Sequence, residues 1–200
     1  PVYQQFIQDL GKKYTLSDQG DLHYYLGVNV KQDLHAGTVH ICQSTYIKVL
    51  ADRFLMANSN PVSTQLQPHI KLTKADCPPV PDKMAVKKYQ QLVGGLMYCS
   101  NFTRVDVAFA VNQCAKFMTN CGPSHINAAK QVLQYLIHTS ERGLCFRRSD
   151  SSPNKLSGYA DADHAADPGV AEYAVSFSMG ALRPARAVKA LISAINPPWQ

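Results

Sequence analysis

The sequence lacks the features of membrane and secreted proteins. None of its apolar runs approaches the ~20 residues that a bilayer-spanning helix needs. Its first stretch, PVYQQFIQDLGKKY, has neither the charged start nor the apolar middle and small-residue cleavage site of a signal peptide. The six cysteines include no C-x-x-C pair and no dense disulfide pattern. These absences predict an intracellular chain, cytoplasmic or nuclear, with no membrane segment and with reduced thiols.

Sequence motifs with the residue spacing of metal-binding or catalytic sites are also scarce. Cys114, Cys121 and His125 lie close in sequence, but their spacing fits neither a zinc finger nor a zinc knuckle. Cys114 falls on the apolar side of an expected helix, where a free cysteine is most often a small buried hydrophobe. No Asp-Asp pair occurs anywhere, no acidic residue follows Glu172, and no small-molecule substrate site is evident.

The composition is that of a globular protein. The 200 residues are 46% apolar and 17% charged, which suffices for one ordinary domain or two small ones. The formal net charge of +6 is compatible with a polyanionic partner. The basic residues are dispersed, however, and such scatter is more often a solvated surface than a nucleic-acid-binding stripe.

Hydrophobic periodicity predicts an α+β chain that begins with a helix and a β-hairpin. The helix is expected over residues 2–10, and the hairpin strands over 21–33 and 38–43. A further helix is expected to begin with Ser44 as its N-cap. The apolar residues at helical spacing in it are Tyr46, Val49, Leu50, Phe54 and Leu55.

Five prolines in residues 57–84 predict a long connector, and this connector is the expected boundary between two subdomains. Three helices should follow it. The apolar stripe of the first is Tyr89, Leu92, Val93, Leu96 and Met97. The second should begin at TRVD, where Thr103 and Asp106 have capping-box spacing. Its apolar face is Val107, Ala110, Val111, Cys114, Phe117 and Met118.

The third helix should follow Gly122 and carry His125 and His138 near its ends, each as a capping or surface residue. Its buried residues are expected to be Ile126, Ala129, Leu133, Leu136 and Ile137. Beyond it, GLCFRR and KLSGYADAD predict two strands of a new sheet. After Pro168 we find no strand alternation, and ALRPARAVKALISAI predicts a weak basic helix interrupted by Pro184.

Five blocks follow one another with short spacers: GDLHYYLGVNV, ICQSTYIKVLADRF, YQQLVGGLMYCSNFTRVDVAFAVNQCAKFM, HINAAKQVLQYLIHTSERGL and LSGYADADHAAD. The series resembles the C-terminal half of the reverse transcriptase of Ty1/copia-type retrotransposon polyproteins, leading into their ribonuclease H domain. It departs from that family at Val105, where proline is usual, and at His164, where tryptophan is usual.

The resemblance implies a division of the chain. Residues 1–56 would be the end of the palm with the primer grip, 57–84 the connector, and 85–140 a helical thumb- and connection-like subdomain. Residues 141–168 would begin an incomplete ribonuclease H-like sheet. Residues 169–200 diverge abruptly, which we interpret as a frameshift or a fused exon.

The resemblance also implies nucleic-acid contacts. Leu26 and Gly27 match the primer-grip hairpin, where glycine lets the nucleic acid approach closely; a plain core hairpin is the alternative. The thumb-like helices would clamp an RNA–DNA or DNA duplex through phosphate contacts. The candidates for those contacts are Lys87, Lys88, Arg104 and Lys130.

Asp161 matches the first carboxylate of the ribonuclease H site, which uses about four carboxylates to hold two Mg²⁺ ions. The acidic residues after it are Asp163, Asp167 and Glu172, whereas the fold draws its later acids from separate elements. Asp161 would therefore be an orphan that ligates metal only if another chain completed the site. The Tyr-x-Asp-Asp turn of the polymerase is also absent.

Mg²⁺ is thus the cofactor of the intact family, and none is expected for this fragment, which we expect to be catalytically inactive alone. Three alternatives stay open. The chain could be a non-catalytic module that binds RNA–DNA hybrids, an enzyme completed in trans by another chain, or a secreted protein directed at a host.

Overall fold

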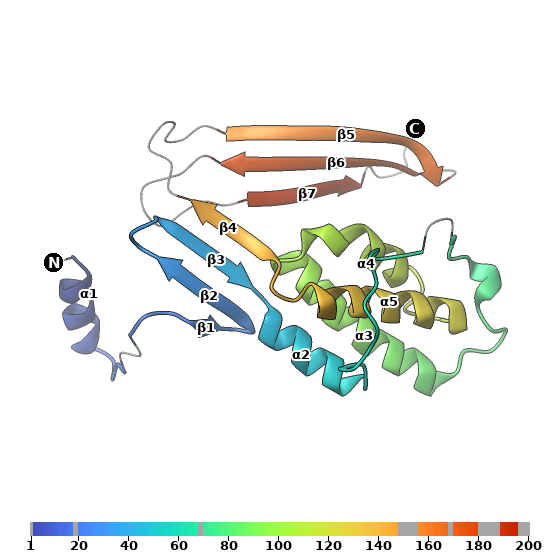
Figure 1. Cartoon of the computed structure of the whole chain (residues 1–200), viewed down its shortest axis with the longest axis horizontal. Coiled ribbons are helices and arrows are strands. Elements are labelled where there is room, and N and C mark those ends of the chain that lie inside the picture. The colour runs from blue at the N-terminus through green and yellow to red at the C-terminus, as the bar shows by residue number, and fades with distance from the viewer. Residues whose placement is uncertain are drawn as a thin grey trace.

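A computed structural model shows the mixed α+β class that the sequence predicts. It describes residues 4–17, 20–67 and 70–147, and the backbone alone of 2–3, 156–167, 170–179 and 189–195. Helix α1 (Val2–Gly11) forms where the sequence predicts a helix. It lies at one end of a four-stranded sheet, and a group of helices lies at the other end (Figure 1). In the described part of the chain, no helix has the length and apolar character needed to cross a membrane.

One antiparallel sheet contains β1 (Tyr24–Tyr25), β2 (Val28–Asp33), β3 (Thr38–Cys42) and β4 (Gly143–Arg147), in that order. The predicted β2–β3 hairpin is confirmed. The single strand predicted over 21–33 is wrong, because the chain reverses at Leu26 and Gly27 and β1 folds back onto β2. The run of apolar and aromatic residues continues across this turn, so periodicity does not reveal it.

The prediction that the GLCFRR segment starts a new sheet is also wrong, because strand β4 joins the first sheet. It pairs with β3 in the register Cys42 to Gly143 and Thr38 to Arg147. A Cβ atom on Gly143 would lie 2.0 Å from the carbonyl oxygen of Ile41, so only glycine permits this approach.

Helix α2 (Ser44–Arg53) begins at the expected residue, but its cap and part of its buried face differ from the prediction. The N-cap is Gln43, and the Ser44 hydroxyl donates instead to Oδ1 of Asn29 at 3.3 Å. Val49 and Leu55 are exposed. The buried residues of the helix are Ser44, Ile47, Leu50 and Ala51, with Tyr46 and Phe54 partly buried against the core.

Helices α3 (Lys83–Phe102), α4 (Ala108–Ala115) and α5 (Pro123–His138) surround the main core and confirm the three predicted helices. The predicted stripes face this core, including Cys114, and all six cysteines are free thiols. The largest fully buried apolar side chains are Tyr89, Ile47, Leu50, Leu96, Leu133 and Leu136. Burial of each such side chain stabilises the fold by about 1.5–3 kcal/mol.

The capping box predicted at Thr103 and Asp106 is wrong. A short 3-10 turn, η2 (Val105–Val107), precedes α4, and the N-cap of α4 is Val107. The Thr103 hydroxyl donates to Oε1 of Gln43 at 2.8 Å. Asp106 is engaged by a neighbouring arginine, as described below.

The described residues of the connector between α2 and α3 are irregular apart from one 3-10 turn, η1 (Lys74–Asp76), and they pack on the helices. His125 is fully buried and caps α5: its Nδ1 accepts from the Gly122 N–H at 2.9 Å, and its Nε2 donates to the Thr73 carbonyl at 3.2 Å. His138 is exposed, with its Nε2 2.7 Å from the Ser59 carbonyl. Since α2 and the connector share the core of α3–α5, the subdomain boundary stays a prediction.

A second antiparallel sheet contains β5 (Leu156–Asp167), β6 (Val170–Met179) and β7 (Lys189–Ile195). The expectation of no strand after Pro168 is therefore wrong. Every second residue from Tyr173 to Met179 is apolar, a period of two that we did not recognise. The predicted basic helix is also contradicted over 189–195, and its first part lies outside the described residues.

Candidate nucleic-acid interface

The tip of the β1–β2 hairpin is a tight two-residue turn. Leu26 and Gly27 both have positive φ angles, 48° and 78°, between the paired residues Tyr25 and Val28. Two consecutive positive φ angles match the twist of a tight hairpin, and glycine adopts them without a Cβ clash. The predicted primer-grip residues thus form the turn itself, and not the middle of a strand.

Two tyrosines from helices α2 and α3 hold this turn in place. The Tyr98 hydroxyl donates to the Leu26 carbonyl, and the Tyr46 and Tyr98 rings meet edge to face with centroids 4.8 Å apart. A Cβ on Gly27 would lie 3.5 Å from each of the two side chains. Burial raises the pKa of the Tyr46 hydroxyl, so this ring stays neutral. The turn is therefore positioned by the helical core.

Apolar and aromatic side chains beside the turn face solvent. Tyr25 is 63% exposed, and Tyr24 and Leu26 are exposed as well. Phe102 is also exposed, with its ring centroid 5.6 Å from that of Tyr98. Exposed aromatic rings on a rigid support can stack on nucleobases or pack against another apolar surface.

The predicted phosphate-contacting lysines are exposed but are not brought into one site. Lys87 and Lys88 lie in the first half of α3. Lys130 lies on α5 and lines a groove to which neither of the other two contributes. Each remains available to an anion, and the role predicted for each stays a prediction.

Arg104 is a correction, because it is buried in the helical core with 1% of its side chain exposed. Its Nε and Nη2 donate to the two carboxylate oxygens of Asp106 at 2.9 and 2.8 Å. Its Nη1 donates to the Thr139 carbonyl at 3.0 Å, and Nη2 also donates to the Thr139 hydroxyl at 2.7 Å. These donors are directed at protein acceptors, so Arg104 has no access to a phosphate.

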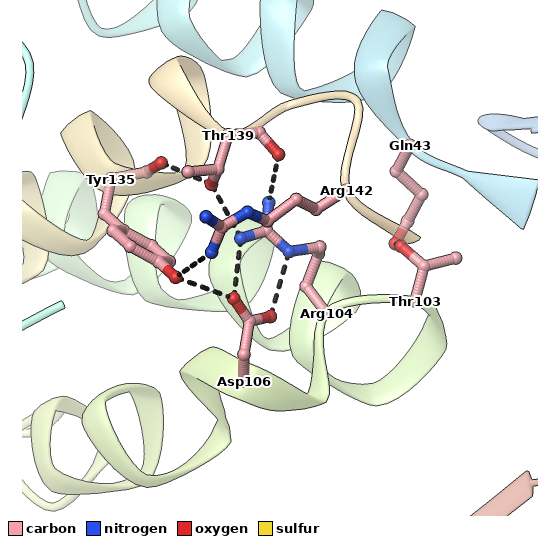
Figure 2. A network of polar contacts seen from close by, with 7 residues as sticks. All are labelled: Gln43, Thr103, Arg104, Asp106, Tyr135, Thr139 and Arg142. Carbon is pink, nitrogen blue, oxygen red and sulfur yellow. Dashed lines mark hydrogen bonds and ion pairs between the residues drawn. The ribbon is translucent and has the colours of Figure 1, made fainter. Parts of the chain in front are cut away.

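The arginine belongs to a polar network that joins η2 to the end of α5 (Figure 2). The Tyr135 hydroxyl donates to Asp106 at 3.1 Å and accepts from Arg142 at 2.9 Å. Burial raises the pKa of the Asp106 carboxyl, but the hydrogen bonds and charge of Arg104 and the Tyr135 hydroxyl outweigh burial, so the pKa is lowered overall. The carboxylate is thus held in its charged form to neutralise the guanidinium.

Sequence reasoning missed this network because TRVD also has the spacing of a capping box. The available signal was an arginine two residues before an aspartate in an otherwise apolar stretch. The partners Thr139 and Arg142 lie more than thirty positions away and are brought close only by the packing of α5. The network joins η2 to the end of α5 and includes no residue of the β1–β2 turn.

Asp161 lies on β5, where it is paired with Ala174 of β6. Its side chain lies outside the described part of the structure. Its assignment as a metal ligand therefore stays a prediction.

No protein-family model matches the chain, and no solved structure matches it. The retrovirus-related Pol polyprotein from transposon TNT 1-94 of Nicotiana tabacum is 37% identical over 181 residues, or 87% of this chain. The corresponding polyprotein from transposon RE1 of Arabidopsis thaliana is 32% identical over 161 residues, or 80% of this chain. The chain spans only 13% and 10% of the lengths of these two relatives.

A third relative is named as a secreted effector and not as a polyprotein. The secreted RxLR effector protein 161 of Plasmopara viticola is 43% identical over 79 residues, which are 40% of this chain and 54% of the effector. The similarity to the TNT 1-94 polyprotein extends over 87% of this chain, more than twice that share.

Proposed function

Because the chain is homologous to one segment of the Pol polyproteins of Ty1/copia-type retrotransposons, we propose that it is the part of a reverse transcriptase that holds the template–primer duplex. The TNT 1-94 and RE1 polyproteins are many times longer than this chain, so the proposal concerns one segment of a larger protein. The partner would be an RNA–DNA or DNA duplex.

The observation that carries the proposal is the anchored hairpin tip. A turn that presents backbone and exposed side chains is useful for positioning a nucleic-acid end only if it is rigid. The Tyr98 hydroxyl and the Tyr46 ring supply that rigidity from the helical core. The sugar and base at a primer end would meet the exposed face formed by Tyr25 and Leu26.

Binding of an RNA–DNA hybrid tests the proposal, measured by fluorescence anisotropy over a range of salt concentrations. The affinity should fall steeply with salt, since each neutralised phosphate releases counterions. Tyr25→Ala should weaken binding about fivefold or more, because one stacked base is worth about 1–3 kcal/mol. Tyr14→Ala is the matched control, since Tyr14 is equally exposed (63%) and lies away from the turn.

The role of the lysines is tested by a second measurement with the same hybrid-binding assay. Replacing Lys87 and Lys88 together by alanine should weaken binding of all sequences alike and reduce the salt slope by about two. Lys48→Ala, an exposed lysine on α2, is the control. A hybrid affinity that does not depend on salt would contradict the proposal.

We infer further that this segment does not catalyse nucleotide chemistry by itself. Its sequence has no Asp-Asp pair and no acid beyond Glu172, whereas two-metal phosphoryl transfer needs several carboxylates around the ions. With Mg²⁺, the isolated segment should neither extend a primer nor cleave a hybrid. Cleavage that disappears in Asp161→Asn would instead support an enzyme in which Asp161 is a metal ligand.

A further inference from the structure

A groove of about 1100 Å³ lies between the end of α2, the connector and the outer face of α5, away from the hairpin tip. Its lining includes Leu55, which is 94% exposed, and Ile70, which is also exposed. Most of the other lining residues are polar and come from the connector and α5. No part of the proposed duplex interface other than Lys130 borders it.

Leu55 is held in a conformation that favours glycine. It follows α2 with φ 56°, and its N–H donates to the Asp52 carbonyl at 3.1 Å while the Met56 N–H donates to the Ala51 carbonyl at 2.8 Å. This pattern is a Schellman motif, in which the left-handed position is usually glycine. An almost fully exposed leucine at that position is unfavourable for the backbone and adds nothing to the core. Such an outlier points to a functional role for its side chain.

Besides charged residues, the polar lining includes uncharged carboxamide and hydroxyl groups, which pair readily with peptide groups. The carboxamides of Asn127 and Gln134 line the groove, and neither makes a hydrogen bond within the described chain. The Ser59 hydroxyl, also in the lining, is buried without a hydrogen-bond partner. A carboxamide both donates and accepts, as a peptide group does, so a row of them can satisfy an extended backbone.

The charges of the groove do not favour a nucleic acid. Lys71 and Lys130 are offset by Asp52 and Asp76, so the lining has no net positive charge. It contains neither an arginine nor an aromatic ring, and therefore offers no platform on which bases could stack. Both features distinguish it from a site for single-stranded DNA or RNA.

We propose that this groove binds an extended, uncharged polypeptide segment, with one apolar side chain of the peptide packed against Leu55 and Ile70. The carboxamides of Asn127 and Gln134 pair with its backbone, since each can both donate and accept a hydrogen bond. This proposal does not depend on duplex binding at the hairpin tip. The two sites are separable by mutation.

The test uses the whole ¹⁵N-labelled chain titrated with the capped hexapeptide Thr-Val-Ser-Leu-Thr-Val, and separately with single-stranded oligothymidylate. The peptide should shift amide signals of residues 55–59 and of Asn127 and Gln134, and oligothymidylate should leave these signals unchanged. Larger shifts of these signals with oligothymidylate than with the peptide would overturn the proposal, as would peptide shifts spread over the whole chain or absent.

Leu55→Asn separates binding from folding, because asparagine tolerates the left-handed conformation better than leucine. The variant should unfold at a higher urea concentration and yet bind the hexapeptide about tenfold more weakly, a loss of about 1.4 kcal/mol. Leu34→Asn, at an exposed leucine outside the groove, should leave the peptide affinity unchanged. Equal peptide affinity of Leu55→Asn and the parent chain would refute the role of Leu55 and with it the proposal.

Discussion

The helical core and the segment that precedes β2 place their apolar side chains in opposite environments. Helices α2–α5 share a core in which large apolar residues such as Leu96 and Leu133 are fully buried. Before β2, Phe6 is 59% exposed, and Tyr14 and Leu22 are exposed too. Several exposed large apolar side chains in one segment are typical of a region that another surface covers. The helical core is therefore expected to set the stability of the chain, and the N-terminal segment to contribute little.

The same difference explains why the hairpin turn can be rigid although the segment before it is exposed to solvent and not anchored. The turn at Leu26 and Gly27 is attached to the core by Tyr98, whereas α1 has no comparable anchor among the described contacts. Rigidity at the tip comes from α2 and α3, and not from the segment before it. Variants in the two regions should therefore have unequal effects.

The largest expected difference is between Leu96→Ala and Phe6→Ala. Leu96 is completely buried in α3, so its truncation leaves a cavity and should lower the free energy of unfolding by about 2–5 kcal/mol. Phe6→Ala should change it by less than about 0.5 kcal/mol, as is usual for surface positions. Urea denaturation followed by circular dichroism measures both. Comparable losses in the two variants would mean that the N-terminal segment belongs to the cooperative core.

The buried ion pair offers the next largest effect. Asp106→Asn leaves the Arg104 guanidinium buried without its counter-charge, which typically costs 3–5 kcal/mol. Because 36% of the Asp106 side chain is exposed, we expect a smaller loss of about 2–3 kcal/mol. Asp9→Asn is the matched control, since Asp9 pairs with Lys12 on the exposed surface of α1. Its unfolding midpoint should stay within error of the parent chain.

Two adjacent glycines of α3 give opposite and smaller effects. A Cβ on Gly94 would meet no atom within 4 Å, so Gly94→Ala should stabilise the helix by about 0.5–1 kcal/mol. A Cβ on Gly95 would lie 2.6 Å from Cδ1 of Leu50, so Gly95→Ala should push α2 outward and cost about 1–3 kcal/mol. Thermal unfolding of the two variants distinguishes tight α2–α3 packing from loose packing. Stabilisation by both would place α2 outside the rigid core.

Much of the helical core and the β2–β3 hairpin were predictable from the sequence, whereas the full set of strands in each sheet was not. The apolar spacing of α3, α4 and α5 is regular because each helix buries one stripe against a common core. Strand β4 was assigned to a new sheet because register and partner depend on distant residues. The close approach of Gly143 to Ile41 depends on how α5 packs, and local sequence patterns carry no information about that packing.

The candidate interface was predicted only in part, and for a similar reason. Leu26 and Gly27 were identified by resemblance, but their anchoring by Tyr98 is a contact across 72 positions. Arg104 was predicted to contact phosphate because the resemblance places it among the thumb-like helices. Its burial depends on two acceptors from Thr139, which no local pattern connects to it. The groove beside Leu55 had no sequence signal at all.

The smallest expected effect is a change in the pH dependence of stability. Desolvation raises the pKa of Asp106, but Arg104 and the Tyr135 hydroxyl lower it further, so the folded carboxyl loses its proton more readily than the ordinary value of 3.8 implies. A carboxyl whose pKa is lower in the folded state stabilises the fold above its unfolded pKa, and that contribution is lost as the pH falls below 3.8 towards the folded value. Urea midpoints of the parent chain should therefore decrease as the pH falls through this window. In Asp106→Asn the decrease should be shallower, because the variant has already lost this carboxylate. Parallel curves would mean that the pH dependence arises outside the network, and that the ion pair does not titrate with folding.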